Sequence, residues 1–198
     1  FIEINSNLNS YYLENENNLW SKGISSCAVC DGALYKKKKI IVVGGGDSAM
    51  EEAAFLTKFS EVTLIHRGET FRASKAMQNK VLNNEKIKIL YNTVITKLNG
   101  SDCIESVICQ NTKTKEKFEL KVDGLFYGLG LKPNSQLFKG ILPLDDENYI
   151  LKSDNSEFTT MTNINGVFVA GDVHDKIYRQ AIVACGDGCR AAMDSIKW

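Results

Sequence analysis

The fold of this chain is decided by the stretch Ile40-Ile41-Val42-Val43-Gly44-Gly45-Gly46-Asp47-Ser48-Ala49. Four apolar residues predict a buried strand, and Asp47 with Ser48 favours the start of a helix. The glycines between them fit the pattern G-x-G-x-x-G/A. In this pattern the first glycine permits a tight turn, the second lets a pyrophosphate approach the backbone, and a small third residue lets helix and strand pack closely. Free N–H groups at the helix start attract phosphate. We therefore expect a dinucleotide-binding turn with contacts from Gly44, Gly45, Gly46, Asp47, Ser48 and Ala49.

The segments that follow the turn predict a βαβ unit. We expect the helix to run from 47 to 59, a strand from 62 to 65 and a second helix from 75 to 82. Parallel strands joined by a helix form a right-handed crossover, so the fold class is α/β with a Rossmann-like, dinucleotide-binding domain.

The end of the second strand selects the nucleotide. Sites for NAD place an acidic residue about 20 residues after the turn, where it binds the ribose 2′-hydroxyl. Here that place holds His66 and Arg67, with Arg72 close behind. Because cations suit a 2′-phosphate, we predict NADPH rather than NADH. The alternative is a structural glycine turn with surface cations.

Alternating apolar and polar residues then predict an antiparallel meander added to the parallel sheet. Its strands are expected at 86–90, 93–98, 104–110 and 117–122, and a buried strand over 123–130 closes the domain.

Three parts are predicted along the chain. Residues 1–20 are rich in Asn, Ser and Glu and form a lead-in segment without regular structure, although Tyr11, Tyr12, Leu13, Leu19 and Trp20 favour docking. Residues 21–130 form the nucleotide-binding domain, and Lys132-Pro133-Asn134 marks the boundary to residues 131–198.

The last part is expected to contain short strands near 149–151 and 166–172, followed by a helix from 178 to 196. The small, apolar side of this helix would be formed by Ala181, Ile182, Ala184, Cys185, Gly188, Ala191 and Ala192.

Composition excludes several classes of function. The 198 residues carry equal numbers of acidic and basic side chains, so we expect no nucleic-acid or acidic-membrane partner. No apolar stretch approaches the roughly 20 residues of a membrane span, and no secretory signal is present. We therefore expect a cytoplasmic protein by default, with an organelle as the alternative. Because the first residue is Phe1 rather than Met, we expect a fragment or a processed product.

The pair Cys27 and Cys30, followed by Asp31, is the second motif. A C-x-x-C pair is half a zinc site, a redox dithiol or two buried thiols. Reduction of a disulfide releases a thiolate that needs a proton, which a neighbouring carboxyl group can relay, so Asp31 favours the redox interpretation.

The other cysteines give zinc little support. A zinc site needs about four ligands, and the remaining candidates are the pair Cys185 and Cys189 with two separate histidines, His66 and His174. We predict no metal site and expect the other cysteines to be buried in the core, namely Cys103, Cys109, Cys185 and Cys189.

In combination, the motifs resemble the low-molecular-weight thioredoxin reductases from about Trp20 onward. The resemblance rests on Ser26-Cys27-Ala28-Val29-Cys30-Asp31-Gly32, on the turn over 44–53, on His66-Arg67 with Phe71-Arg72-Ala73, on Gly130-Leu131-Lys132-Pro133-Asn134, on Gly166–Val173, and on Tyr178-Arg179-Gln180-Ala181-Ile182.

The resemblance implies a flavoprotein that passes electrons from NADPH through FAD to the Cys27–Cys30 disulfide and on to thioredoxin, usually as a homodimer. It implies that Cys30 faces the flavin, that Cys27 attacks thioredoxin and that Asp31 is the acid. It also places Gly130, Gly171, Asp172, Arg179, Gln180 and Ala181 at the cofactors, with residues 131–198 as the C-terminal part of the FAD domain.

Two departures from the family pattern matter. Gly68 stands where the family often has a second arginine, which weakens the expected preference for NADPH. The family also begins with another glycine-rich turn for the FAD pyrophosphate, and this chain has one such turn only. We therefore expect the chain to lack the phosphate anchor of FAD.

The leading hypothesis is an NADPH-dependent thioredoxin-disulfide reductase whose activity needs that missing segment. One alternative is a related flavoprotein reductase that serves a peroxiredoxin or a glutaredoxin-like acceptor. The other is that the isolated chain is an NADPH-binding fragment without turnover.

Overall fold

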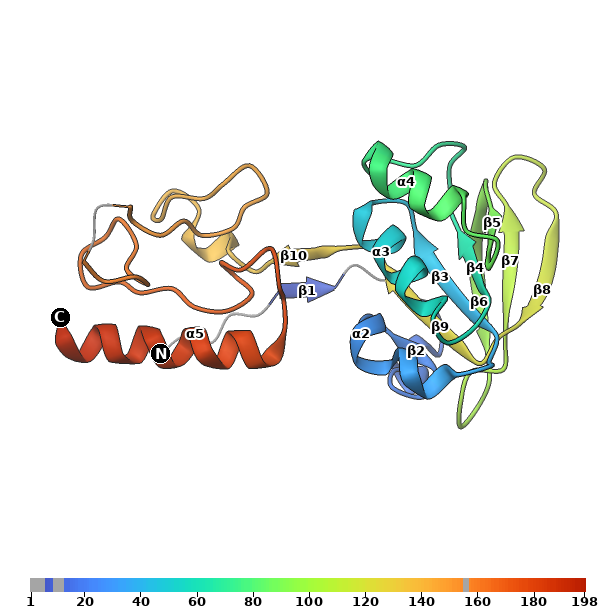
Figure 1. Ribbon diagram of the computed structural model, residues 1–198, viewed down its shortest axis with the longest axis horizontal. Coiled ribbons are helices and arrows are strands. Elements are labelled where there is room, and N and C mark those ends of the chain that lie inside the picture. The colour runs from blue at the N-terminus through green and yellow to red at the C-terminus, as the bar shows by residue number, and fades with distance from the viewer. Residues whose placement is uncertain (1–5, 9–12, 155–156) are drawn as a thin grey trace. The chain divides into compact units, whose positions relative to one another are not determined.

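The computed structural model describes residues 6–8, 13–154 and 157–198. It forms two compact units: one joins β1 (Ser6–Leu8) to Leu131–Trp198, and the other contains the described residues from 13 to Gly130 (Figure 1). The predicted α/β fold class is confirmed, with a parallel and an antiparallel sheet in the second of these units. The domain boundaries proposed from the sequence stay predictions.

A five-stranded parallel sheet forms the centre of the unit that ends at Gly130, in the order β2-β9-β3-β4-β5. All residues of β3 and β9 are buried, as expected for central strands of a parallel sheet. The predicted strands at 40–43 and 62–65 are confirmed. The strands are β2 (Ile24–Ser25), β3 (Ile40–Gly44), β4 (Val62–Ile65), β5 (Ile87–Leu90) and β9 (Gly124–Gly128).

Two helices form the crossover connections from β3 to β4 and from β4 to β5. Helix α3 (Asp47–Leu56) ends three residues earlier than predicted, and α4 (Lys75–Leu82) has the predicted bounds. Ala49, Met50 and Ala53 of α3 are fully buried in one core with β3, β4 and β9. The short helices α2 (Ala28–Asp31) and η1 (Gly32–Tyr35) lie between β2 and β3.

The predicted meander is only partly correct. Strands β6 (Thr93–Asn99), β7 (Ser106–Asn111) and β8 (Lys117–Lys121) are antiparallel, but they form a separate three-stranded sheet. The first predicted strand is instead β5, which pairs parallel to β4 at the sheet edge. A half-buried edge strand alternates in the same way whichever direction its neighbour runs, so its sequence could not show the difference.

The lead-in segment has more structure than predicted. Strand β1 pairs antiparallel with β10 (Leu131–Pro133), and α1 (Glu16–Leu19) buries Leu19 completely. Trp20 lies beside Tyr127 of β9, with ring centroids 5.9 Å apart. Tyr11 and Tyr12 fall outside the described residues.

The unit that joins β1 to Leu131–Trp198, called here the C-terminal unit, contains fewer strand residues than predicted. The segments near 149–151 and 166–172 form only the isolated bridges Leu144–Ile150 and Met161–Phe168. A small core holds Leu142, Ile150, Val169 and Val173, and η2 (Gln136–Phe138) precedes it. The final helix α5 (Ala181–Lys197) starts three residues later than predicted, because Asp175 holds the preceding residues in a turn.

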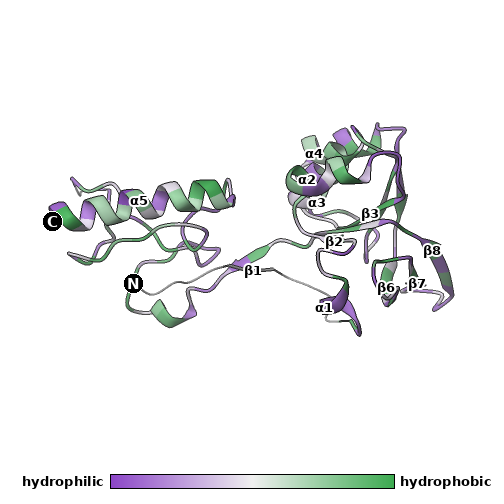
Figure 2. Ribbon diagram, turned by 90° about the horizontal axis from the view of Figure 1, so that it is seen from below, coloured by the Kyte–Doolittle hydropathy of each residue, from purple (hydrophilic) through white to green (hydrophobic). Residues whose placement is uncertain are grey.

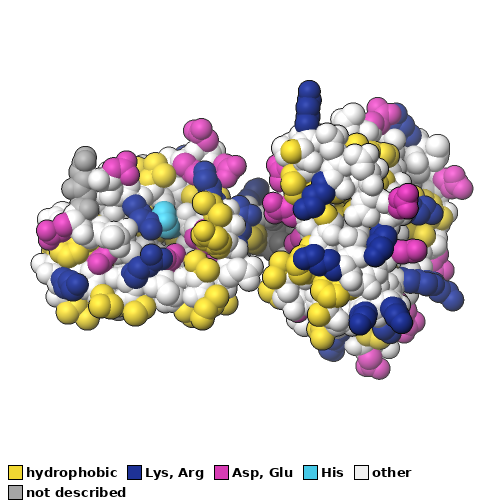
Figure 3. Space-filling model, in the orientation of Figure 1, with side chains coloured by type: hydrophobic (Ala, Val, Ile, Leu, Met, Phe, Trp, Pro, Cys, Tyr) yellow, Lys and Arg dark blue, Asp and Glu magenta, His cyan; other side chains and the backbone are white. Residues whose placement is uncertain are grey.

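Helix α5 does not bury the apolar side that the sequence suggests. Asp187 is the only buried residue of α5, whereas Ile182 and Ile196 are 81% and 84% exposed. Figure 2 shows hydrophobic segments along this helix, and Figure 3 shows hydrophobic side chains on its outer side. Cys185 and Cys189 are exposed on α5, and Cys103 is exposed in the turn before β7, so only Cys109 is buried as predicted.

A buried carboxyl group on α3 leads to a prediction about stability. Glu52 Oε2 is buried and has no hydrogen-bond partner among the described residues. Burial, and secondarily the charge of Glu51, raises the pKa of Glu52 from 4.5 to about 8. Between these pH values the folded state holds a proton that the unfolded chain releases, so stability falls as pH rises.

We expect Glu52→Gln to be more stable than the wild type by about 1–3 kcal/mol at pH 8 and nearly equal to it near pH 4.5, because the amide needs no proton to stay neutral. Thermal melting across this range measures the effect, with exposed Glu61→Gln as the control. A gain that does not depend on pH would contradict the assignment.

Candidate active site

The Cys27–Cys30 pair forms a disulfide with a Cα–Cα distance of 5.3 Å. Cys27 is the N-cap of α2, and its Sγ accepts a hydrogen bond of 3.2 Å from the backbone N–H of Cys30. A donor aimed at the sulfur stabilises a thiolate there after reduction. Cys30 is exposed and Cys27 is half-buried, so the disulfide can be reached by a reactant.

Ser25 is a site residue that the sequence did not reveal. Its hydroxyl donates to Asp31 Oδ2 at 2.6 Å and accepts the backbone N–H of Cys27 at 3.1 Å. Ser25 thereby fixes the Asp31 carboxylate relative to the disulfide. In the sequence, the only sign of this role is that a serine stands two residues before Cys27. Serine is common at such positions, so this sign was too weak for a prediction.

Tyr35 lies near the same carboxylate. Burial, and then the charge of Asp31, raises the pKa of the Tyr35 hydroxyl. Its ring packs edge-on against Phe126, with centroids 5.3 Å apart, and directly over the backbone of Gly124. The ring therefore connects the disulfide segment to the central strand β9.

The glycine turn has the close approaches that its pattern predicts. A Cβ on Gly44 would lie 2.3 Å from the carbonyl oxygen of Gly128 and 2.6 Å from Cβ of Ala49. Gly44 also has φ +154°, which L-residues rarely adopt. In contrast, a Cβ on Gly46 at the N-cap of α3 would meet nothing within 4 Å. The turn is tight toward the sheet and open where an anion would approach.

The loop over residues 66–74, called here the specificity loop, is tied to this turn. The carbonyl oxygen of Gly45 accepts the N–H groups of Arg72 and Ala73 at 2.8 and 3.1 Å. The carboxylate of Asp47 accepts both the N–H and the hydroxyl of Ser74, at 2.9 and 2.8 Å. Asp47 therefore organises the loop, and Ser74 is a second contributor that the sequence did not reveal.

The buried side chain of His66 contacts both the glycine turn and the specificity loop. Its ring nitrogens lie 3.2 Å from the Gly44 carbonyl oxygen and 2.9 Å from that of Thr70. Arg67 and Arg72 are exposed, and in the described part of the chain neither guanidinium group has an ion-pair partner. The loop thus presents two available cations beside the glycine turn.

The disulfide and the turn lie at the same edge of one sheet. β2 leads into Cys27 and β3 leads into Gly44, and both strands pair parallel to β9, which lies between them. At roughly 4.8 Å per strand, the two strands are about 10 Å apart. β2 ends opposite Phe126, two residues before the level at which β3 ends opposite Gly128. The carboxyl edge of a parallel sheet is where α/β folds bind ligands.

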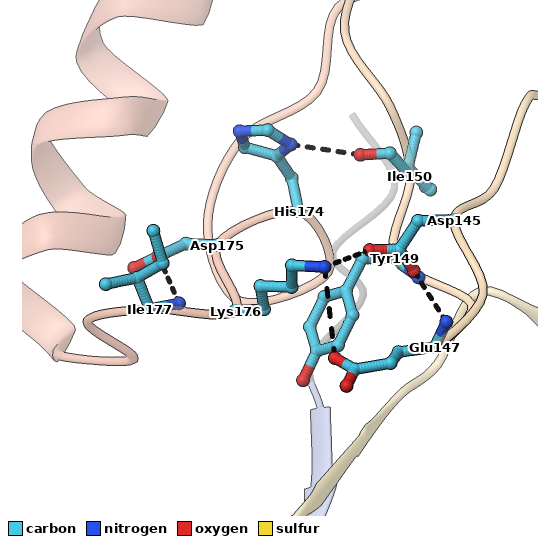
Figure 4. A network of polar contacts seen from close by, with 8 residues as sticks. All are labelled: Asp145, Glu147, Tyr149, Ile150, His174, Asp175, Lys176 and Ile177. Carbon is cyan, nitrogen blue, oxygen red and sulfur yellow. Dashed lines mark hydrogen bonds and ion pairs between the residues drawn. The ribbon is translucent and has the colours of Figure 1, made fainter.

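In the C-terminal unit, a polar network shapes the segment before α5 (Figure 4). The Asp145 carboxylate accepts the Lys176 ammonium at 2.7 Å and the N–H groups of Glu147 and Tyr149 at 2.9 Å each. Burial raises its pKa, but these donors outweigh burial and hold the pKa of Asp145 below its ordinary value. Nδ1 of His174 lies 2.9 Å from the carbonyl oxygen of Ile150, and burial lowers the pKa of His174.

Asp175 continues this network into the start of α5. Its carboxylate accepts the N–H groups of Ile177, Tyr178 and Arg179, at 2.9, 3.0 and 3.0 Å. This turn places Arg179 at φ 49°, with its guanidinium 5.7 Å from the centre of the Tyr149 ring.

The predicted FAD contacts lie around this turn. Arg179 Nε is buried and has no hydrogen-bond partner among the described residues. Burial, and then Asp175, raises the pKa of half-buried Asp172, while Arg179 opposes that shift. Gly171 has φ +75°, Gln180 is the N-cap of α5, and Ala181 is exposed. An unsatisfied donor beside a half-buried carboxyl group fits contacts to a polar cofactor.

Comparison with known proteins now identifies the family. A family model described as pyridine nucleotide-disulphide oxidoreductase matches residues 7–188. The chain belongs to this family. The family's thioredoxin reductases use FAD and NADPH. Within the described residues, no cluster of three or more His, Cys, Asp or Glu could hold a metal ion. The same residues include no helix with the length and hydropathy of a membrane span.

Several similar proteins within the family are thioredoxin reductases. The Dictyostelium discoideum enzyme is 51% identical over 182 residues, which are 90% of this chain and 56% of that protein. Thioredoxin reductase 2 of Arabidopsis thaliana is 46% identical over 92% of this chain and 48% of its own. The solved structure from Giardia duodenalis is 40% identical with a TM-score of 0.89, covering 98% of this chain and 63% of that one. The chain spans about half the length of the curated relatives it matches.

Substitution of the turn glycines tests which of them faces a ligand. We expect Gly46→Ala to fold normally and to bind NADPH at least about tenfold more weakly, because its methyl group fills the open side of the turn. We expect Gly45→Ala to lose about 1–3 kcal/mol of stability, because its Cβ would lie 2.3 Å from the His66 ring.

Calorimetric titration with NADPH and thermal melting separate the two effects. Gly186→Ala, which fills open space on α5, is the control and should leave the NADPH affinity unchanged. Equal nucleotide affinity in Gly46→Ala and the wild type would contradict the role of this turn.

Proposed function

We propose that this chain is the NADPH- and disulfide-bearing part of an NADPH-dependent thioredoxin-disulfide reductase. The observation that carries the proposal is the shared sheet edge: β2 brings the Cys27–Cys30 disulfide, and β3 brings the glycine turn with the cations Arg67 and Arg72. A single rigid element thus presents both an electron acceptor and a nucleotide site.

The two cofactors are NADPH and FAD. In the proposed site, Gly44, Gly45, Gly46, Ser48 and Ala49 form the pyrophosphate turn, while Asp47 and His66 hold the specificity loop. Arg67 and Arg72 bind the 2′-phosphate. Gly171, Asp172, Arg179, Gln180 and Ala181 serve the flavin side, where the unsatisfied Arg179 Nε supports a contact. Gly130 is proposed as a further cofactor-binding residue.

When bound, NADPH and FAD supply the electron pair that reduces the Cys27–Cys30 disulfide. In the dithiol, the hydrogen bond from the Cys30 N–H favours a thiolate on Cys27. Cys27 attacks the disulfide of oxidised thioredoxin and forms a mixed disulfide. Cys30 then attacks the Cys27 sulfur, which re-forms the disulfide and releases reduced thioredoxin, whose two thiolates take up protons from solvent. Asp31, held by Ser25, takes the proton of Cys30 in this step and returns one when the disulfide is next reduced.

The proposed partner is thioredoxin. A Mycobacterium leprae relative, 42% identical over 92% of this chain, is named a bifunctional thioredoxin reductase/thioredoxin, which favours this acceptor over a peroxiredoxin or a glutaredoxin-like domain. Net charge zero, with charges of both signs mixed on the face drawn in Figure 3, supports a protein partner rather than nucleic acid or a membrane.

The proposal also includes the oligomeric state and the cellular location of the protein. We infer a homodimer for the full-length protein and a cytoplasmic location. An organelle is the alternative, since one Arabidopsis relative is named a mitochondrial thioredoxin reductase.

The proposal is tested by two measurements on the purified chain. Its visible absorption spectrum shows whether flavin is bound, and a colourless chain would mean that turnover needs a further FAD-binding segment. The chain is then reduced with dithiothreitol, desalted and mixed with oxidised thioredoxin, which needs no flavin. We expect rapid transfer to thioredoxin and slow transfer to oxidised peroxiredoxin. Faster transfer to peroxiredoxin would overturn the proposed acceptor.

The same transfer tests the positioning role of Ser25. We expect Ser25→Ala to slow it about tenfold and to shift its pH profile, because Asp31 loses its 2.6 Å hydrogen bond. Asp31→Asn should slow it about 100-fold or more. Ser26→Ala, the exposed neighbour, is the matched control. An unchanged rate and pH profile in Ser25→Ala would show that this hydrogen bond is only structural.

A further inference from the structure

The hairpin between β7 and β8, together with Asn92 before β6, contacts three consecutive residues of the specificity loop. The Thr112 hydroxyl lies 3.4 Å from the Arg67 carbonyl oxygen. The Asn92 N–H donates to the Gly68 carbonyl oxygen at 3.0 Å, and the Asn92 carbonyl oxygen accepts the Thr112 N–H at 2.6 Å. Finally, Lys113 forms an ion pair with Glu69. The antiparallel sheet therefore supports the loop that carries Arg67.

Glu69 is the one acidic residue of the specificity loop. It follows the end of β4, where NAD-dependent sites place a carboxylate for the ribose hydroxyls. A free carboxylate there would repel a 2′-phosphate and would counteract Arg67 and Arg72. The Lys113 ammonium offsets this charge from outside the loop.

The pair is solvent-exposed, with 59% of the Lys113 side chain and 64% of the Glu69 side chain accessible. Exposed pairs of this kind contribute little to the stability of a fold. A bound phosphate dianion, however, responds to any unbalanced charge within a Debye length, which is about 10 Å at 0.1 M salt. The pair is thus suited to control which nucleotide binds rather than whether the chain folds.

We propose that Lys113 is a specificity-determining residue of the nucleotide site: it neutralises Glu69 and so permits a nucleotide with a 2′-phosphate. This proposal rests on the proposed NADPH function. Gly68 leaves the loop without a second cation between Arg67 and Glu69. On this proposal, Lys113 of the β7–β8 hairpin supplies the positive charge instead.

The test uses 2′,5′-ADP and 5′-AMP, which carry the adenosine half of NADPH and NADH and require no flavin. Calorimetry measures their Kd values for the wild type, Lys113→Met, Glu69→Gln and the double variant. We expect Lys113→Met to weaken 2′,5′-ADP binding about three- to tenfold without weakening 5′-AMP binding. Glu69→Gln should tighten 2′,5′-ADP binding, and the double variant should return to within about twofold of the wild type.

Two controls separate a local charge effect from a general one. Lys117→Met removes the same charge from the same hairpin, and Lys117 has no ion pair in the described part of the chain. It should change neither Kd. In 0.5 M NaCl the effect of Lys113→Met should shrink, because salt screens exposed charges. Melting temperatures verify that each variant is folded.

These measurements show separately whether the NADPH preference holds and whether Lys113 contributes to it. If the wild type prefers 2′,5′-ADP and Arg67→Ala loses the preference, the NADPH site stands. The Lys113 proposal is then overturned if Lys113→Met leaves the preference unchanged or acts no differently from Lys117→Met. If the wild type binds both probes equally, the NADPH preference fails and the Lys113 proposal fails with it.

Discussion

The close approach of α3 to strands β3 and β9 is the constraint on which the rest of this structure depends. Ala49 lies against Gly44 and Gly128, where a Cβ on either glycine would fall within 2.6 Å of atoms of Ala49. Only glycine on both strands lets the helix start so close to the sheet. Its free N–H groups therefore open directly at the carboxyl edge of the strands, where an anion can be bound.

The same turn determines where the specificity loop lies. Gly45 and Asp47 accept four hydrogen bonds from residues 72–74, and His66 bridges the turn and Thr70. The ring of Phe71 packs between His66 and Tyr91, with centroids 5.0 Å from each. Because the loop is fixed by both hydrogen bonds and packing, Arg67 and Arg72 project from a rigid support. Preorganised cations of this kind bind a phosphate without first having to order a loop.

The disulfide depends on the same sheet through a different strand. β2 has only two residues, yet its pairing with β9 places Ser25 directly before the disulfide segment. Ser25 then orients Asp31, and Tyr35 packs against β9. The disulfide segment and the glycine turn thus follow two strands that flank β9, while the antiparallel sheet of β6, β7 and β8 supports the specificity loop from outside.

By itself the sequence determined the glycine turn, the helices after it, the redox pair and the family resemblance, because each depends on local spacing or on residue type. Only the tertiary structure decided what depends on partners distant in the chain. It made β5 a parallel edge strand, assigned β1 and β2 to sheets, and left the apolar side of α5 exposed. It also brought Lys113 to Glu69, 44 residues apart, and no local pattern encodes a contact across that separation.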